Sequence, residues 1–358
     1  MGGRTTQAAN HGEGGDGAVT RGAIIRLVGA MLLVALPPAV VALRSAATAE
    51  AQPSGMAVRV GRLHPGSPTS PRTQANLGVF RAGLRELGWI EGRNLVIEHR
   101  YAEGKPERLA ALADDLARSK VDVIVAVGHP GISAAQQATA TIPIVMAASS
   151  DPVRFGFVQN LARPEGNITG LSLESQDLHG KRLELLKEAV SGLRKVAIVS
   201  NPSHPGHADF IRESEVAARA LGIKMLVLKA GRTDSVEGMV RAAIQANAGA
   251  LLVLSDPLML DDAGPRISAL ALKQRLPTLF AWRHLAEGGG FISYGANLDA
   301  MTRRSAFYVD RLLKGAKPGG LPVEQPTTFE LVVNLKTATA LGLTISPSLG
   351  LRVDRVVE

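Results

Sequence analysis

The sequence predicts an α/β protein with two lobes of like topology, each built on a parallel β-sheet. At 358 residues the chain is too long for one average domain, and its 46% apolar content is ample for packed cores. Short apolar runs alternate with helical patterns, as in βαβ units whose sheet is covered on both faces. The pattern occurs twice, because VDVIVAVGHP leads through a helix to TIPIVMAASS and AGALLVLSDP leads through a helix to RLPTLFAWRH.

The amino terminus has the order of a secretory signal peptide. Residues 1–22 are rich in Gly, Ala and Thr without periodicity, so we expect them to be disordered. Two arginines then precede the apolar run Leu27–Leu43, and small residues follow at alternating positions. We therefore expect residues 1–51 to direct export to the periplasm, with cleavage near Ala49 to Ala51. An uncleaved membrane anchor is the alternative, but the apolar run is short for a span of roughly 20 residues and contains two prolines.

The first half of the mature chain carries strands and helices in regular alternation. The helix over Thr73–Leu87 places Leu77 and Phe80 on one face. It ends at Gly88, and Pro106 favours the start of the next helix. We expect strands at Val58–Leu63, Asn94–His99, Val121–Val127, Ile142–Ala147 and Asn167–Ser172, and helices at Thr73–Leu87, Pro106–Arg118 and from about Ser133 to Thr139.

The second half repeats this alternation and then adds segments that return to the first lobe. Asn334 is placed to cap the last predicted helix, and Gly342 ends that helix. We expect strands at Lys195–Ser200, Ile223–Leu228, Ala250–Leu254, Gly290–Gly295 and Phe329–Asn334, and a further strand within RLPTLFAWRH that ends at Trp282. We expect helices at Asp177–Val190, 207–221, 234–246, Asp299–Leu313 and Leu335–Leu341.

Because late segments return to an earlier lobe, the lobes should be discontinuous in sequence. The expected first lobe comprises residues 57–166 and about 296–325, and the expected second lobe comprises residues 167–290 and about 330–358. The segments expected to act as hinges lie near 167–171, 291–295 and 323–334.

Ligands of open α/β sheets bind at the carboxyl ends of strands, where helix N-termini offer unpaired N–H groups. Six loops occupy such positions here, and they would converge on one cleft if the lobes face each other. A zwitterion suits this cleft, because its carboxylate can meet hydroxyls such as Ser133 or Ser149. Its ammonium would meet Asp151 or Asp256. The other candidate ligand-binding residues are His64, Ser67, His129, Asn201, Ser255, Trp282 and Tyr294.

Some of these candidates also have an alternative interpretation, in which the residue has a structural role and does not bind the ligand. Asp151 and Asp256 precede proline, where Asp is a common turn former. The loop histidines, His204 among them, lack the short spacing of a metal site, so we expect no metal. Trp282 could instead pack at a hinge, and Tyr294 could instead form a hinge hydrogen bond.

Composition and missing motifs narrow the function classes. Cysteine is absent, which removes disulfides, thiolate metal ligands and a Cys nucleophile. The net charge of +8 is spread along helices without a basic run, so we expect solvated helix faces and no nucleic-acid partner. The chain contains no GxSxG, no GxxxxGK[ST], no HExxH and no GxGxxG after a strand. We therefore expect neither catalysis nor a cofactor.

From Val58 onwards the chain resembles the ABC-transporter substrate-binding proteins of the TrpX-like family. The resemblance is carried jointly by LRELGWIEGRN, IPIVMAASSDPV, LARPEGNITGLS, GGGFISYGANL, YVDRLLKGAKP and LPVEQPTTFELVVNLKTATALGLTI. It implies a type I periplasmic-binding-protein architecture, with two Rossmann-like lobes joined by three hinge crossings that close on a small solute. Some relatives are associated with aromatic amino acids. His129 and Arg283 depart from the usual family pattern and favour a more acidic or larger ligand than tryptophan.

The expected function is therefore that of an exported solute-binding protein. It would capture a small polar solute, such as an amino acid or a related molecule, and deliver it to an ABC permease in the inner membrane. We expect it to act as a monomer. A periplasmic ligand-sensing protein that feeds a receptor or regulator is one alternative, and an α/β enzyme is another. A repressor would need a DNA-binding helix-turn-helix, whereas this amino terminus reads as an export signal.

Overall fold

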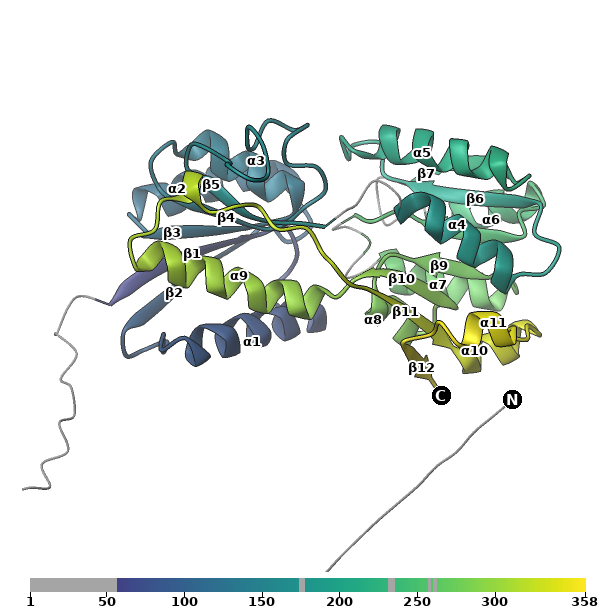
Figure 1. Cartoon of the computed structure of the whole chain (residues 1–358). Helices are drawn as coiled ribbons and strands as arrows, with labels where there is room; N and C mark the ends of the chain where they lie inside the picture. Colours follow the sequence, from purple (N-terminus) through teal and green to yellow (C-terminus); the bar gives the residue numbers. More distant parts are fainter. Residues whose placement is uncertain (1–56, 174–177, 231–235, 257–258, 260–262) are drawn as a thin grey trace, which may run out of the picture. The chain divides into compact units, whose positions relative to one another are not determined.

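Figure 1 shows the computed structural model, which describes residues 57–173, 178–230, 236–256, 259 and 263–358. The expected signal peptide and its cleavage site lie outside the described residues, as do Asp177, residues 234–235 and Pro257 of the predicted turn. In the part of the chain that the structure describes, no helix has the length and apolar character that a membrane span requires.

The first sheet is parallel, with the strand order β2-β1-β3-β4-β5 among the described residues. Its strands are β1 (Val58–His64), β2 (Leu95–Tyr101), β3 (Val123–Val127), β4 (Ile144–Ser149) and β5 (Ile168–Ser172). The helices that cover it are α1 (Pro71–Glu86), α2 (Leu109–Arg118), α3 (Gly128–Ala138) and α9 (Leu298–Leu313), and a 3₁₀ turn, η1 (Pro106–Arg108), precedes α2. Helices α1 and α9 pack together on one face, and α2 and α3 pack on the other (Figure 1). Successive residues of β1 point to opposite faces, so Val60 packs toward α1 and Leu63 toward α2.

The second sheet has the order β12-β11-β10-β9-β8-β6-β7 and is parallel except where β11 runs antiparallel to β10. Its strands are β6 (Lys195–Ser200), β7 (Lys224–Lys229), β8 (Ala250–Val253), β9 (Thr278–Phe280), β10 (Ile292–Ala296), β11 (Phe329–Asn334) and β12 (Arg355–Val357). One face is covered by α4 (Leu178–Ala189), α5 (His207–Ala220), α10 (Leu335–Leu341) and α11 (Pro347–Gly350). The other face is covered by α6 (Val236–Gln245), α7 (Gly264–Lys273) and α8 (Arg283–Glu287).

The predicted fold class is confirmed, since strands alternating with helices form two parallel-sheet lobes. Strand β11 and helix α10 have the predicted bounds because their signals are local: Asn334 Oδ1 accepts from the Thr337 N–H at 2.9 Å, and Gly342 ends the helix at φ 72°. The sequence analysis missed α8, α11 and β12, which are too short to show a periodic pattern. It also did not foresee that β11 pairs antiparallel with β10.

Three segments connect the two sheets in the described chain. The first follows β5, the second joins β10 to α9, and the third runs from the 3₁₀ turn η4 (Pro318–Gly320) to β11. The third segment lies beside β5, where the Ser172 N–H donates to Glu324 O at 2.8 Å. The expected crossing near 167–171 instead forms β5 of the first sheet, because these residues pair with β4. The first crossing between the sheets therefore starts after Ser172. The remaining lobe bounds, and the role of the three crossings as hinges, stay predictions.

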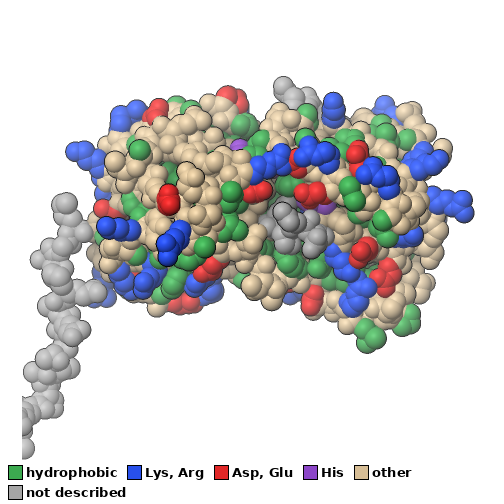
Figure 2. Space-filling model, turned by 45° about the horizontal axis from the view of Figure 1, so that its top comes forward, with side chains coloured by type: hydrophobic (Ala, Val, Ile, Leu, Met, Phe, Trp, Pro, Cys, Tyr) green, Lys and Arg blue, Asp and Glu red, His purple; other side chains and the backbone are tan. Residues whose placement is uncertain are grey.

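Charged side chains are interspersed on the surface. On the face drawn in Figure 2, Lys and Arg side chains lie among Asp, Glu and neutral ones. Ion pairs among the described residues lie within one element or between neighbours, such as Arg81 with Glu91 and Lys181 with Glu184. This is the distribution expected for solvated helix faces.

Candidate functional site

A cavity lies where the carboxyl ends of strands from both sheets meet. It contains about 820 Å³ of empty space, including the part that is open to solvent. The first lobe contributes residues at the ends of β1, β3 and β4 together with α1 and α9, and the second lobe contributes residues after β6, β8 and β9. This is the position at which open α/β sheets bind ligands.

One part of the cavity wall is apolar. Phe80 of α1, Val125 of β3 and Met301 of α9 lie on the first-lobe side and are buried. Trp282, which follows β9, lies on the second-lobe side and is also buried. Leu173, the residue after β5, completes this surface. Such walls suit an apolar or aromatic group of a bound molecule.

Arg62 places a guanidinium in the same wall. It lies in β1 on the face of Val60, because alternate strand residues share a face. Its residue exposure is 3%, and its Nη1 has no hydrogen-bond partner among the described residues. Burial lowers the pKa of Arg62, and the neighbouring Tyr101 hydroxyl, which hydrogen-bonds to it, acts in the opposite direction. The sequence analysis missed this residue, although an arginine inside a short buried strand was a usable signal.

Asp256 places a carboxylate on the second-lobe side. It is 2% exposed, and its Oδ2 accepts from Asn201 Nδ2 at 2.9 Å. Asn201 Oδ1 in turn accepts from the Ser203 N–H at 2.9 Å. The loops that follow β6 and β8 are thus linked, and this linkage fixes the position of the carboxylate at the cavity.

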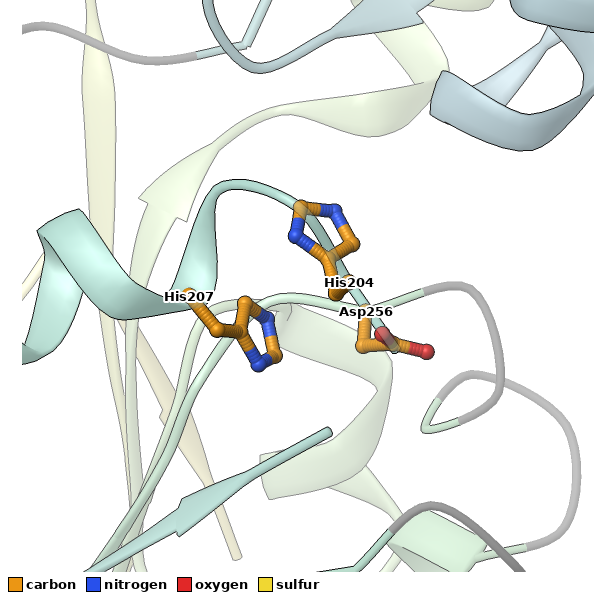
Figure 3. A group of neighbouring side chains, drawn as sticks. All are labelled: His204, His207 and Asp256. Atoms are coloured by element: carbon orange, nitrogen blue, oxygen red, sulfur yellow. The ribbon is translucent and has the colours of Figure 1, made fainter. Parts of the chain in front are cut away.

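His204, His207 and Asp256 form a compact group whose possible ligand atoms lie within 4.8 Å of one another (Figure 3). His207 already uses both ring nitrogens: Nδ1 accepts from the Asn201 N–H at 2.8 Å, and Nε2 therefore carries the proton and donates to Ser255 O at 3.0 Å. A metal ion would have to displace one of these bonds. The arrangement therefore orders the two loops through hydrogen bonds, and the buried His204 side chain lines the cavity.

Four of the predicted ligand-binding residues line the cavity, namely His129, Ser255, Asp256 and Trp282. Ser133 and Asn201 line an adjoining cavity, which shares His129, His204 and Asp256 with the first. Burial lowers the pKa of His129, whose ring lies 6.1 Å from that of His204 across the junction of the lobes. The structure thus brings the loops after β3, β6, β8 and β9 together, and the ligand-binding roles of their residues stay predictions.

The other five predicted residues lie outside the lining of both cavities. His64 is buried and its Nδ1 accepts from the Gly66 N–H at 2.9 Å, whereas Ser67 is partly buried and its hydroxyl hydrogen-bonds the Thr69 hydroxyl at 2.9 Å. Ser149 is fully buried in β4.

Asp151 lies in a turn, which is the alternative role that the sequence indicated for an Asp before proline. Its Oδ1 accepts from the Arg154 N–H at 3.1 Å. Tyr294 lies in β10 with its ring 6.0 Å from that of Phe329, and it lines a separate cavity between α4 and α5. The lining residues that the sequence analysis did not select are Arg62, Asn76, Phe80, Leu173, His204 and Met301.

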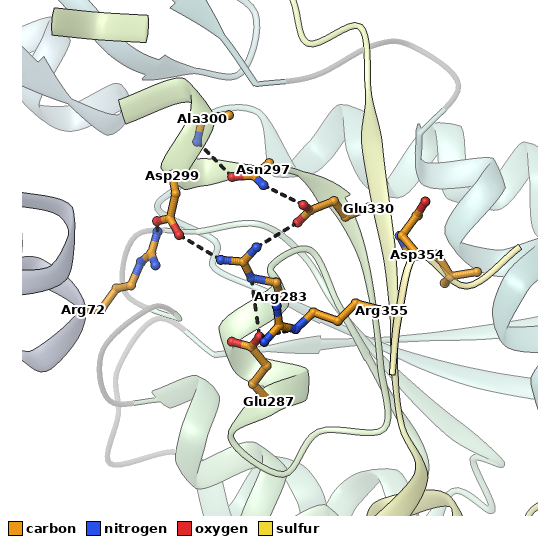
Figure 4. A network of polar contacts seen from close by, with 10 residues as sticks. Arg72, Arg283, Glu287, Asn297, Asp299, Ala300, Glu330, Asp354 and Arg355 are labelled. Atoms are coloured by element: carbon orange, nitrogen blue, oxygen red, sulfur yellow. Dashed lines mark hydrogen bonds and ion pairs between the residues drawn. The ribbon is translucent and has the colours of Figure 1, made fainter. Parts of the chain in front are cut away.

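Arg283 points into an ion-pair network and not into the cavity (Figure 4). Its Nη2 lies 2.8 Å from Asp299 Oδ2, its Nη1 lies 3.5 Å from Glu330, and Asp299 Oδ1 also pairs with Arg72 at 2.9 Å. Arg283 is thus neutralised by carboxylates, so it does not supply the acidic-ligand preference that the sequence suggested. It lines a different, smaller cavity with Arg72 and Glu330.

Comparisons with known proteins agree with this architecture. Residues 70–357 match the family model described as ABC transporter substrate binding protein. The chain is 27% identical over 273 residues to a tyrosine-binding protein of Clostridioides difficile (strain R20291), covering 75% of this chain and 77% of that relative.

Solved structures are similar over most of the chain. A conserved domain protein from Vibrio cholerae O1 biovar El Tor superposes with a TM-score of 0.78 at 27% identity, covering 84% of this chain and 99% of that one. The ABC domain in complex with L-Trp from Streptococcus pneumoniae has a TM-score of 0.78 at 23% identity, covering 84% and 100% of the two chains. At 23% identity, the similarity to the Streptococcus pneumoniae structure shows that the two chains share a fold.

Proposed function

Because this chain belongs to the family of ABC transporter substrate-binding proteins, we propose that it is the exported component of an ABC importer that captures an amino acid or a related small solute. The family is one of binding proteins and not of enzymes. The solute would bind in the cavity between the two lobes and leave it unchanged when the complex reaches the permease.

The observation that carries this proposal is the pairing of apolar walls with a buried carboxylate in one cavity. Phe80, Met301 and Trp282 suit the apolar body of a solute, and Asp256 suits an ammonium group. Amino acids with apolar side chains combine these two features. Two relatives support the same class, because one is named as a tyrosine-binding protein and another is solved in complex with L-Trp.

Export to the periplasm is part of the proposal. It is supported by the order of basic, apolar and small residues in positions 1–51 and by the family itself. The partner would be a permease in the inner membrane, and the binding protein would act as a monomer.

A thermal-shift screen of the purified full-length protein tests the proposal. The panel contains aromatic and branched-chain L-amino acids, small carboxylates, polyamines, nucleosides and sugars. A solute present at about a hundred times its dissociation constant should stabilise the folded protein by roughly 2.7 kcal/mol, and it should be recovered chemically unchanged. Conversion of the bound solute to a product would contradict the proposal, as would the absence of any stabilising solute across the amino acids and carboxylates.

A further inference from the structure

The surroundings of Arg62 lack a compensating negative charge. No carboxylate of the described residues lies within ion-pair distance of its guanidinium, and the neighbouring Arg81 is itself paired with Glu91. The other titratable groups around it are the Tyr101 hydroxyl and the imidazoles of His64 and His99. Burial and the charge of Arg62 both favour the neutral form of the two histidines.

A buried cation without a partner is unfavourable. Removing a guanidinium from water costs free energy that only an anion or several hydrogen bonds can offset. Tyr101 supplies one hydrogen bond, whereas Nη1 of Arg62 has none among the described residues. The folded protein therefore holds an unsatisfied positive group in the wall of its cavity.

A second polar group lies in the same wall. Asn76 of α1 lines the cavity one helical turn before Phe80, and its Oδ1 has no hydrogen-bond partner among the described residues. An amide that is not engaged through its oxygen can rotate to present its NH₂ group to an anion. One planar guanidinium with one amide donor suits a carboxylate, which guanidinium groups bind through two parallel hydrogen bonds.

We propose that Arg62 is the anion receptor of the solute site, so that the solute is a carboxylate with an apolar body and its carboxylate pairs with the Arg62 guanidinium. This inference rests on the proposed function and deepens it, because it names the group that selects the solute. Arg62 thus accounts for the preference for an acidic solute that the sequence suggested for Arg283. Arg283 cannot account for it, because Asp299 and Glu330 neutralise its charge.

The test compares each amino acid with its carboxamide, which keeps the amino group and replaces the carboxylate by an uncharged amide, by isothermal titration calorimetry on the full-length protein. The probes are L-tyrosine with L-tyrosinamide and L-tryptophan with L-tryptophanamide. The wild-type protein should bind at least one acid about tenfold or more tightly than its amide, which corresponds to about 1.4 kcal/mol. Arg62→Met should reduce this difference to within about twofold, whereas Arg62→Lys should keep a preference for the acid, because it retains the charge.

Arg59→Met is the matched control. Arg59 lies on the same strand, pairs with Glu98 and does not line the cavity, so its loss should leave the acid-to-amide ratio at the wild-type value. A second readout separates the receptor role from a structural one. Without solute, Arg62→Met should melt at the wild-type temperature or above it, because the variant removes an uncompensated buried charge.

The outcomes that overturn the inference are distinct from those that overturn the proposed function. A wild-type protein that binds acid and amide equally removes the receptor role and leaves the binding function intact. An Arg62→Met variant that keeps the full acid preference and melts several degrees lower shows that Arg62 is a structural residue. A wild-type protein that binds none of the solutes in the wider screen contradicts both.

Discussion

At the scale of single residues, Asp256 is the group that we expect to meet a cationic end of the solute. Its carboxylate is held by Asn201 at 2.9 Å. Asp256→Asn keeps an oxygen that can accept this bond but removes the charge, so affinity for an amino acid should fall about tenfold while the melting temperature changes little. Calorimetric titration measures the affinity, and Asp114→Asn, at an exposed position on α2, serves as the control. A larger loss of affinity in Asp151→Ala than in Asp256→Asn would contradict this assignment.

The two histidines beside Arg62 should make the stability of the protein depend on pH. Burial, followed by the nearby Arg62 charge, lowers the pKa of His64 to about 3 and that of His99 to about 4. The unfolded chain therefore takes up protons that the folded protein does not, as pH falls below the ordinary histidine pKa of roughly 6.5. Stability should be fully present above this pH and should decrease toward pH 4. His64→Gln, which can still accept from the Gly66 N–H, should make the decrease in melting temperature shallower, and an unchanged slope would refute the role of His64.

At the scale of elements, the close approach of β4 and β5 depends on Gly170. This residue has φ +130°, and a Cβ atom added to it would lie 2.4 Å from Met146 O in the neighbouring strand. Gly170→Ala should therefore lower the free energy of unfolding by at least about 2 kcal/mol, through backbone strain and separation of the strands. Chemical denaturation measures this change.

The matched control is Gly78→Ala in α1. A Cβ atom at Gly78 meets nothing within 4 Å, so this substitution should stabilise the helix by roughly 0.5–1 kcal/mol. Equal effects of the two substitutions would show that the approach of β4 and β5 is not tight.

The elements predicted well from sequence are those whose signals are local. The cap at Asn334 and the terminating Gly342 determine α10 to the residue, and alternation of apolar runs with helices determines the α/β class. The expectation that ligands bind at the loops after strands also selected Asp256 and Trp282, which line the cavity. The remainder depends on tertiary structure: sequence shows that Arg62 lies in a strand, but the packing of α1 and α9 over that strand decides which face bounds the cavity.

Across the whole molecule, ion pairs outside the solute cavity join the two lobes. Asp209 of α5 pairs with Arg154 from the loop after β4, and Asp299 of α9 pairs with Arg283 of α8, while its bond to Arg72 of α1 lies within the first lobe (Figure 4). These contacts favour the arrangement in which both lobes bound one cavity. They should therefore increase solute affinity by raising the population of the binding-competent state.

Asp299→Asn tests this coupling. Partly exposed ion pairs contribute roughly 0.2–1 kcal/mol each, so the variant should bind solute about two- to fivefold more weakly. Glu237→Gln is the control, because Glu237 pairs with Arg266 within the second lobe at 2.8 Å. Equal affinities in the two variants, measured by titration at low salt, would show that Asp299 does not couple the lobes.

The most direct measurement of the central claim is a crystal structure of the protein grown with the solute that stabilises it most. We expect one solute molecule in the cavity between the lobes, with its carboxylate against the Arg62 guanidinium and its apolar body between Phe80 and Trp282. A solute bound instead in the cavity beside Tyr294, or on the outer surface with the Arg62 cavity empty, would contradict the account.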